Sequence, residues 1–143
     1  MITPDVNLLI HAYNTASPSH AQAREWWEGL LNDRTATVGL TWVAVMGFVR
    51  IVTHPKVLAS PLEPRLACRY ARTWLSRGNV SILQPGPRHA QIFFGLLESL
   101  GTAGNLTTDA HLASIAIEFQ AELHTTDADM SRFSGLSWRN PLR

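Results

Sequence analysis

The chain has 143 residues, of which 45% are hydrophobic and 16% charged, which excludes a disordered protein and predicts one domain, residues 1–143, with a well-filled core. Twelve basic and eleven acidic residues give a net charge of +1, which excludes a polybasic or acidic tail but allows a local nucleic-acid-binding patch. All the basic residues except Lys56 are arginines. This bias suits phosphate binding, but genomic base composition explains it more simply.

Cys68 is the only cysteine, so neither an internal disulfide nor a multi-thiolate metal site is expected. The segment 1–14 lacks the basic start and the long apolar run of a signal peptide. No stretch approaches the roughly 20 apolar residues that span a bilayer. We therefore expect a cytoplasmic protein without membrane contact.

Five segments have apolar residues at the spacing of an amphipathic helix. In chain order they lie within 23–31, 42–49, 67–75, 92–100 and 112–119. Ser17 and Pro18 signal the start of the first helix, and Thr108 is expected to cap the last.

Short runs typical of strands alternate with these helical segments. They are residues 1–3, 36–40, 80–83, 122–125 and 136–138. The stretch 61–64 is expected to be a loop between two helices and not a domain boundary. Strands that alternate with helices predict an α/β fold with a mostly parallel sheet.

Four of the five aspartates either follow a predicted strand or lie at the start of a predicted helix. Asp5, and then Asp127 and Asp129, directly follow predicted strands, and Asp109 lies in the first turn of the last predicted helix. Ligands of parallel sheets bind beyond the carboxyl ends of the strands, so these carboxylates are expected to converge there. Carboxylates brought together either protonate or share a cation, and oxygen ligands favour Mg²⁺ or Mn²⁺.

Each aspartate also has a simpler interpretation. Asp109 suits an ordinary helix-capping or dipole-pairing aspartate, and Asp127 with Asp129 suits an Asx-turn and the cap of a short helix. Asp5 is harder to explain in this way, because it lies between Ile2 and an apolar run and should be partly buried. The three places together favour a metal site.

Three short motifs carry a resemblance to a known family. Asp5-Val6-Asn7-Leu8-Leu9-Ile10, Thr107-Thr108-Asp109-Ala110-His111-Leu112-Ala113 and Thr125-Thr126-Asp127-Ala128-Asp129 resemble the acidic segments of PIN-domain ribonucleases. Their order and spacing, which extend over essentially the whole chain, are most similar to those of the toxin subunits of bacterial VapBC toxin–antitoxin pairs.

The resemblance implies a PIN-like three-layer α/β/α domain with a short-stranded, mostly parallel central sheet. It implies Asp5, Asp109 and Asp127 as catalytic residues that, with Asp129, hold Mg²⁺ (or Mn²⁺), supported by Asn7, Thr125 and Thr126. The implied activity is that of a type II toxin, a Mg²⁺-dependent endoribonuclease that hydrolyses phosphodiester bonds in tRNA or rRNA. The implied partners are an RNA substrate, a cognate antitoxin that blocks the site, and a second copy in a homodimer.

One position departs from the family pattern. The family usually has a glutamate in the second helix, just ahead of a hydrophobic residue and an arginine, and here Gly47 stands at that place, before Arg50. No Asp or Glu lies between Asp33 and Glu63, so the acid has not shifted by a turn. Three explanations stay open: the site works with one ion, its activity is reduced, or another group substitutes.

The arginines have two interpretations. Arg65, Arg69 and Arg72 share one face of a predicted helix, where a solvated face is the commoner explanation and contact with RNA phosphates the alternative. Arg50 is the better candidate, for RNA binding or for a structural role, because its helix should border the acidic site.

Two other classes of function compete with the nuclease. A catalytically degenerate PIN module would bind RNA or a protein partner without cleavage, and Gly47 is the main support for it. A phospho-accepting receiver-like domain also collects aspartates at strand ends, but it needs a lysine after a late strand. The only lysine, Lys56, follows the second predicted helix, which disfavours this class.

Overall fold

The computed structural model describes all 143 residues and contains a five-stranded, wholly parallel sheet with strand order β3-β2-β1-β4-β5. The strands are β1 (Ile2–Pro4), β2 (Val38–Thr41), β3 (Val80–Leu83), β4 (Glu122–His124) and β5 (Trp138–Arg139). The predicted α/β class and parallel sheet are therefore confirmed. All five predicted strands are present, within two residues of the expected positions.

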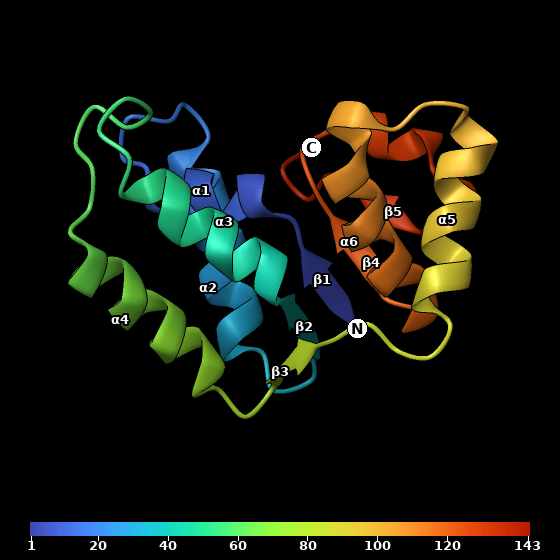
Figure 1. Cartoon of the computed structure of the whole chain (residues 1–143). Helices are drawn as coiled ribbons and strands as arrows, with labels where there is room; N and C mark the ends of the chain where they lie inside the picture. Colours follow the sequence, from blue (N-terminus) through green and yellow to red (C-terminus); the bar gives the residue numbers. More distant parts are fainter.

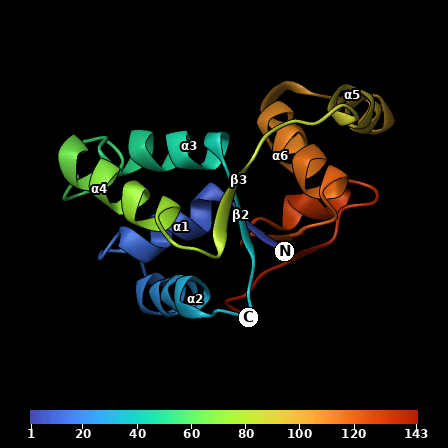
Figure 2. The ribbon, with the colours of Figure 1, turned by 90° about the horizontal axis from the view of Figure 1, so that it is seen from below.

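Helices cover both faces of this sheet, as Figures 1 and 2 show. On one side lie α1 (Val6–Tyr13), α2 (His20–Asn32), α3 (Trp42–Val52) and α4 (Pro64–Leu75), and on the other lie α5 (His89–Leu100) and α6 (Thr107–Glu118). Two 3₁₀ turns, η1 (Gly104–Leu106) and η2 (Ala128–Arg132), precede α6 and follow β4. This is the expected three-layer α/β/α arrangement. No helix is both long and apolar enough to cross a membrane.

A hydrophobic core fills the space on each side of the sheet. The larger core lies under α1 to α4 and centres on Trp27, Phe48 and Trp74, which are essentially inaccessible to solvent. Their rings pack edge to face, with centroids of Phe48 and Trp74 4.7 Å apart and of Trp27 and Trp74 5.5 Å apart. The smaller core joins α5 and α6 to β4 and η2. These two cores hold the strand ends, and hence the loops that follow them, in fixed positions.

The sequence predicts five of the six helices and misses α1. This helix has only eight residues, six of them apolar: Leu8, Leu9 and Ala12 are buried, and Val6, Ile10 and Tyr13 are partly buried against the core. A short helix that is apolar around most of its circumference has no clear polar face, so its periodicity is weak. Its start is nevertheless marked by Asp5, which caps it.

The expected cap of the last helix is wrong. Thr108 lies inside the first turn of α6, whose N-cap position is Leu106 and which has no side-chain cap. The cap is missing because η1 runs directly into α6, so the backbone is already helical at Leu106.

Candidate functional site

Asp5 is fixed by the pairing of β1 with β4. Ile2, Thr3 and Pro4 lie opposite Glu122, Leu123 and His124 in parallel register. The N–H of Asp5 continues this ladder and donates to the carbonyl oxygen of His124 over 2.9 Å. The Asp5 side chain then caps α1, accepting from the N–H of Val6 at 2.7 Å, and only 6% of the residue is exposed. The expectation that this carboxylate is partly buried is confirmed.

The buried Thr125 hydroxyl joins the first and last motifs. It donates to Asp5 Oδ2 over 2.7 Å and accepts from the N–H of Asp127 at 3.0 Å. Asn7 Nδ2 lies 3.2 Å from this hydroxyl and 3.3 Å from Asp5 Oδ2, while Asn7 Oδ1 accepts from the N–H of Thr126 at 3.4 Å. These contacts set the direction in which Asp5 points, because both of its oxygens are engaged.

Asp109 reaches the same place from α6. It lies in the first turn of that helix, and together with Asp5 it lines a cavity of about 90 Å³. The helix has no side-chain cap, so Asp109 does not cap it, although its place in the first turn suits the dipole-pairing interpretation. The cavity is also lined by Thr108, for which only a capping role was expected.

The carboxylates after β4 have a structural role as well as a position near the site. Asp127 is the N-cap of η2 and accepts from the N–H of Asp129 at 2.9 Å, so the capping interpretation is right for Asp127. Asp129 lies in the first turn of η2 and is exposed. Neither residue lines the cavity of Asp5 and Asp109, but both lie close enough to act on Asp109 electrostatically.

Burial and the repulsion between carboxylates raise the pKa of Asp5 and Asp109. Burial, followed by the negative charges of Asp5, Asp127 and Asp129, raises the pKa of the Asp109 carboxyl to about 6. Burial also raises the pKa of Asp5, against the hydrogen bonds from Thr125 and Val6, and the charge of Asp127 adds to the rise. No positive side chain is among the groups that act on either carboxyl. A bound cation would therefore relieve repulsion that the protein itself leaves uncompensated.

These residues fit a small, hard cation. Their donors are oxygens only, which suits Mg²⁺ or Mn²⁺. The cavity has a volume of about 90 Å³, enough for an ion and part of its hydration shell. No group of three or more acidic, histidine or cysteine side chains already encloses a metal position. Asp5 and Asp109 could hold the ion from within the cavity, with the charges of Asp127 and Asp129 close by.

Gly47 and Arg50 lie at the same cavity. Both residues line it, from α3, together with Asp5 and Asp109. A Cβ atom at position 47 would lie 3.0 Å from Cγ2 of Val6, so α3 and α1 are closely packed where the family pattern expects a glutamate.

The other candidate arginines lie elsewhere. Arg65 and Arg69 are exposed on α4 and do not line the acidic cavity. Arg72, also exposed, borders a separate apolar groove between α3 and α4. Of the four candidate arginines, only Arg50 lines the acidic cavity.

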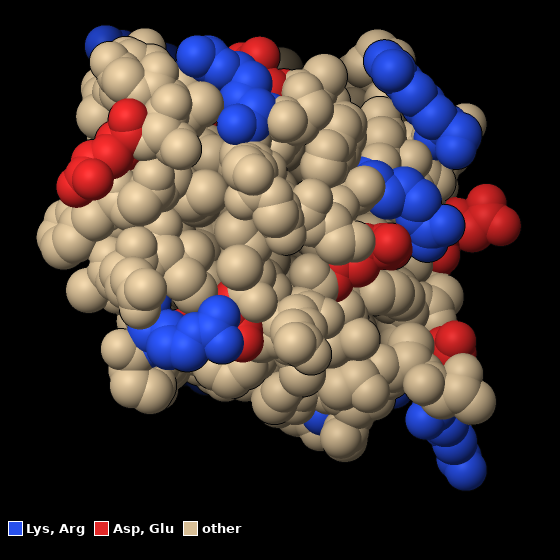
Figure 3. Space-filling model, turned by 90° about the vertical axis from the view of Figure 1, so that its right-hand side faces the viewer, with Lys and Arg blue, Asp and Glu red and all other residues tan.

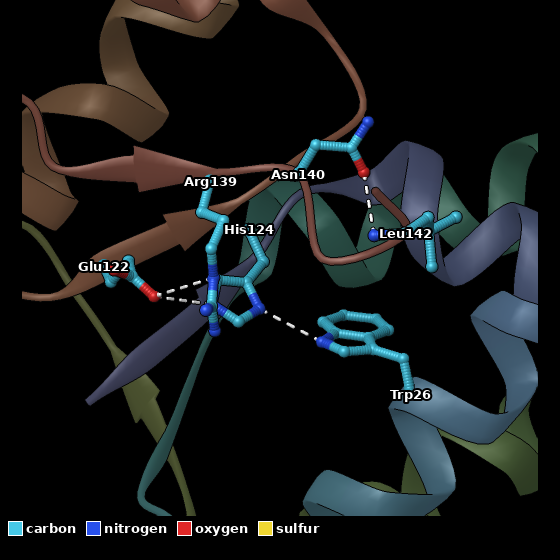
Figure 4. A network of polar contacts seen from close by, with 6 residues as sticks. All are labelled: Trp26, Glu122, His124, Arg139, Asn140 and Leu142. Atoms are coloured by element: carbon cyan, nitrogen blue, oxygen red, sulfur yellow. Dashed lines mark hydrogen bonds and ion pairs between the residues drawn. The ribbon is translucent and has the colours of Figure 1, made fainter.

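A polar network that the sequence did not predict joins the end of β4 to α2 and β5 (Figure 4). Trp26 Nε1 on α2 donates to His124 Nδ1 over 3.0 Å, which leaves the proton of a neutral His124 on Nε2, 2.8 Å from Glu122 Oε1. Burial lowers the pKa of His124, which favours this neutral form. Arg139 Nε of β5 lies 3.6 Å from the same Glu122 oxygen. The strand that leads into Thr125 is thereby tied to α2 and β5.

A much larger cavity lies away from the carboxylates. It has a volume of about 660 Å³ and lies where the chain enters β2 and β3, lined by Arg34 and Arg77 among others. None of the candidate site residues lines it. Size alone is therefore a poor guide to the site in this protein.

Comparison with known proteins places the chain in a family. The model of the PIN domain matches residues 2–136. Ribonuclease VapC33 of Mycobacterium tuberculosis is 50% identical over 143 residues, 100% of this chain and 99% of the relative. Ribonuclease VapC37 of the same species is 36% identical, covering 96% of this chain and 94% of the relative.

Solved structures agree with this assignment at the level of the fold. VapBC-1 from nontypeable Haemophilus influenzae superposes with a TM-score of 0.69 at 17% identity, over 100% of both chains. VapBC2 from Rickettsia felis, bound to a DNA fragment from its promoter, gives a TM-score of 0.67 at 20% identity, over 98% of both chains. The chain belongs to the PIN-domain family and, within it, to the VapC ribonucleases.

Removing the Asp109 charge should stabilise the protein when no divalent cation is present. Because the pKa of Asp109 in the folded protein is about 6, above its ordinary 3.8, ionisation of this carboxyl costs stability. The cost sets in as the pH rises from about 4 to about 6 and is constant above that range. We expect Asp109→Asn to melt at a higher temperature than the wild type at about pH 7.5 in EDTA, and at the same temperature at about pH 3, below both pKa values.

Asp33→Asn is the matched control. Hydrogen bonds from Thr35 lower the pKa of the exposed Asp33, so its loss should destabilise the protein at neutral pH instead. Thermal unfolding followed by circular dichroism measures both effects. An Asp109→Asn variant that melts below the wild type in EDTA at neutral pH would contradict the repulsion described here.

Proposed function

We propose that the protein is the toxin of a type II toxin–antitoxin system, a Mg²⁺-dependent endoribonuclease that hydrolyses phosphodiester bonds in cellular RNA. The observation that carries this proposal is the group of carboxylates at the carboxyl edge of the sheet, whose charge no protein cation balances. The ribonuclease names of relatives that align over essentially the whole chain support it. As substrate we propose tRNA or rRNA in the cytoplasm, acted on by residues 1–143 as a single domain.

The side chains have distinct roles in this reaction. Asp5 and Asp109, with Asp127 and Asp129, would hold the divalent cation, which supplies positive charge where the phosphate becomes more negative. Thr125 and Asn7 keep Asp5 pointed into the cavity through the hydrogen bonds to its Oδ2. In the overall reaction water adds across one P–O bond: its hydroxyl joins phosphorus and its proton goes to the oxygen that leaves.

Loss of the buried Asp5 carboxylate should abolish cleavage without unfolding the protein. Purified wild-type protein should cut RNA in Mg²⁺ and not in EDTA, and Asp5→Asn should cut at least about 100-fold more slowly, because the cation loses its most fixed ligand. Asp33→Asn, which changes a carboxylate far from the cavity, serves as the control and should cut at the wild-type rate. Gel analysis of a defined tRNA and of rRNA fragments measures the rates. Equal rates for the wild type and Asp5→Asn would contradict the proposal.

A degenerate module is the second candidate, and Gly47 favours it, because an expected acidic ligand is missing from the cavity wall. Such a protein would bind RNA with or without Mg²⁺ and never cleave it. Measuring binding and cleavage on the same RNA, with EDTA as the control, separates the two candidates.

We also propose a cognate antitoxin as the partner, in keeping with the VapBC complexes among the structural neighbours. A surface for it lies beside the acidic site. The groove between α3 and α4 is mostly apolar, and Trp42 and Met46 on its wall are 48% and 61% exposed. Arg50 and Arg72 border it, so a segment with apolar and acidic side chains would complement it.

A charge in this groove should prevent the antitoxin from binding. Met46→Asp places an unpaired carboxylate in an apolar contact and should weaken the complex by about 100-fold or more. Val57→Asp is the control, because Val57 is 58% exposed and lies outside the groove. Titration calorimetry with the purified antitoxin measures both affinities, and equal affinities would place the partner elsewhere.

We further propose a homodimer. The face seen in Figure 3, on the side of α5 and α6, has charged side chains mainly towards its rim and much uncharged surface in its middle. Phe94 of α5 is 58% exposed. Aromatic residues are enriched at protein interfaces, so this exposed ring favours α5 as part of the contact. Sedimentation of the isolated chain tests this proposal.

A further inference from the structure

The family pattern expects a glutamate at position 47 of α3, beside the acidic cavity. In this protein the side chain of Val6 fills the space next to that position. Val6 Cγ2 would lie 3.0 Å from a Cβ atom at Gly47, which is tighter than an ordinary van der Waals contact. Val6 follows Asp5 directly, so the turn that presents the first carboxylate also fills this space. The helix α3 itself, from Trp42 to Val52, contains no acidic residue.

The rest of the cavity wall offers few ligands for a second ion. Apart from Asp5, Asp109 and the hydroxyl of Thr108, the wall is made of apolar side chains, glycine and one arginine. The apolar members are Val6, Val43, Ala44 and Leu112. In sites with two metal ions the ions lie about 4 Å apart, and each needs its own set of ligands. Two carboxylates in a cavity of about 90 Å³, whose remaining wall is largely apolar, fit one ion better than two.

Arg50 is the only positively charged residue that lines this cavity. It lies one turn beyond Gly47 on α3 and lines both the acidic cavity and the neighbouring groove. Its side chain is exposed and forms no ion pair with any acidic residue. It is also absent from the charges that act on Asp5 and Asp109. Its guanidinium is therefore free to bind phosphate oxygens with two parallel hydrogen bonds.

We propose that the site holds one divalent cation and that Arg50, in place of a second cation, binds the non-bridging oxygens of the RNA phosphate that is cleaved. Arg50 forms hydrogen bonds only and exchanges no proton with the substrate, since its guanidinium stays charged at every relevant pH. This inference rests on the proposed ribonuclease activity and adds to it the number of ions and the residue that replaces one of them.

The number of ions is tested by direct titration. Binding of Mn²⁺, followed by electron paramagnetic resonance of the free ion, should saturate at one ion per chain, and Asp5→Asn should lose that ion. Saturation at two ions per chain, both lost in Asp5→Asn, would overturn the proposal.

The role of Arg50 is tested by comparing it with an arginine elsewhere. Arg50→Gln should lower kcat by about 100-fold, because a charged donor to the phosphate is lost, while leaving Mn²⁺ affinity unchanged. Arg50→Lys keeps the charge but not the paired geometry and should cut at an intermediate rate. Arg88→Gln, on the exposed N-cap of α5, is the matched control and should cut within about 3-fold of the wild type.

RNA binding without cleavage gives an independent readout. In the Asp5→Asn background and in EDTA, Arg50→Gln should weaken RNA binding more than Arg88→Gln does. If Arg50→Gln and Arg88→Gln cut and bind alike, the role of Arg50 is wrong even though the nuclease activity stands. If the wild type binds Mn²⁺ and RNA but cuts nothing, the proposed function fails instead.

Discussion

The pairing of β1 with β4 is the interaction on which the candidate site depends. These strands are separated by more than a hundred residues, yet they lie side by side with Pro4 opposite His124. Because they are parallel, their carboxyl ends meet, and Asp5 and Thr125 follow at the same edge of the sheet. The Thr125 hydroxyl then binds Asp5 directly, over 2.7 Å. Loss of this pairing would separate the first and last motifs and leave a buried carboxylate without its partner.

The carboxylates gathered at this edge of the sheet repel one another and lower the stability of the protein. The pKa of Asp109 is raised to about 6 because burial and three other carboxylates act on it and no protein cation compensates. Such a site destabilises the protein alone and becomes favourable when a cation completes it, which is the usual relation between functional sites and stability. The two apolar cores on either side of the sheet supply the stability that tolerates it. Gly47 reduces the repulsion, since a fifth carboxylate is absent from this wall.

The sequence predicts the outline of this arrangement well. Alternating strands and helices give the parallel sheet, and the rule that ligands bind beyond strand ends is enough to expect Asp5 and Asp127 near one another. The burial of Asp5 follows from the apolar residues around it. The helix α1 is missed because its apolar residues surround most of it, although Asp5 marks its start.

Contacts between distant segments could not be predicted in the same way. Nothing local indicates that Trp26 donates to His124, 98 residues further along the chain, or that Val6 fills the space beside Gly47. The capping of η2 by Asp127 was one of two interpretations, and the structure shows that capping and proximity to the site occur together. Such outcomes depend on the packing of whole elements, which residue patterns do not specify.

The central claim is that the converging carboxylates bind a divalent cation, and paramagnetic broadening by Mn²⁺ tests it most directly. In a nuclear magnetic resonance titration of the wild-type protein, amide signals near Asp5, Asp109 and Asp127 should broaden first and together. Signals around Asp33 should be spared, because that exposed aspartate belongs to a turn remote from the cavity. Broadening centred on Asp33 or on scattered surface acids, with the three motifs unaffected, would contradict the account.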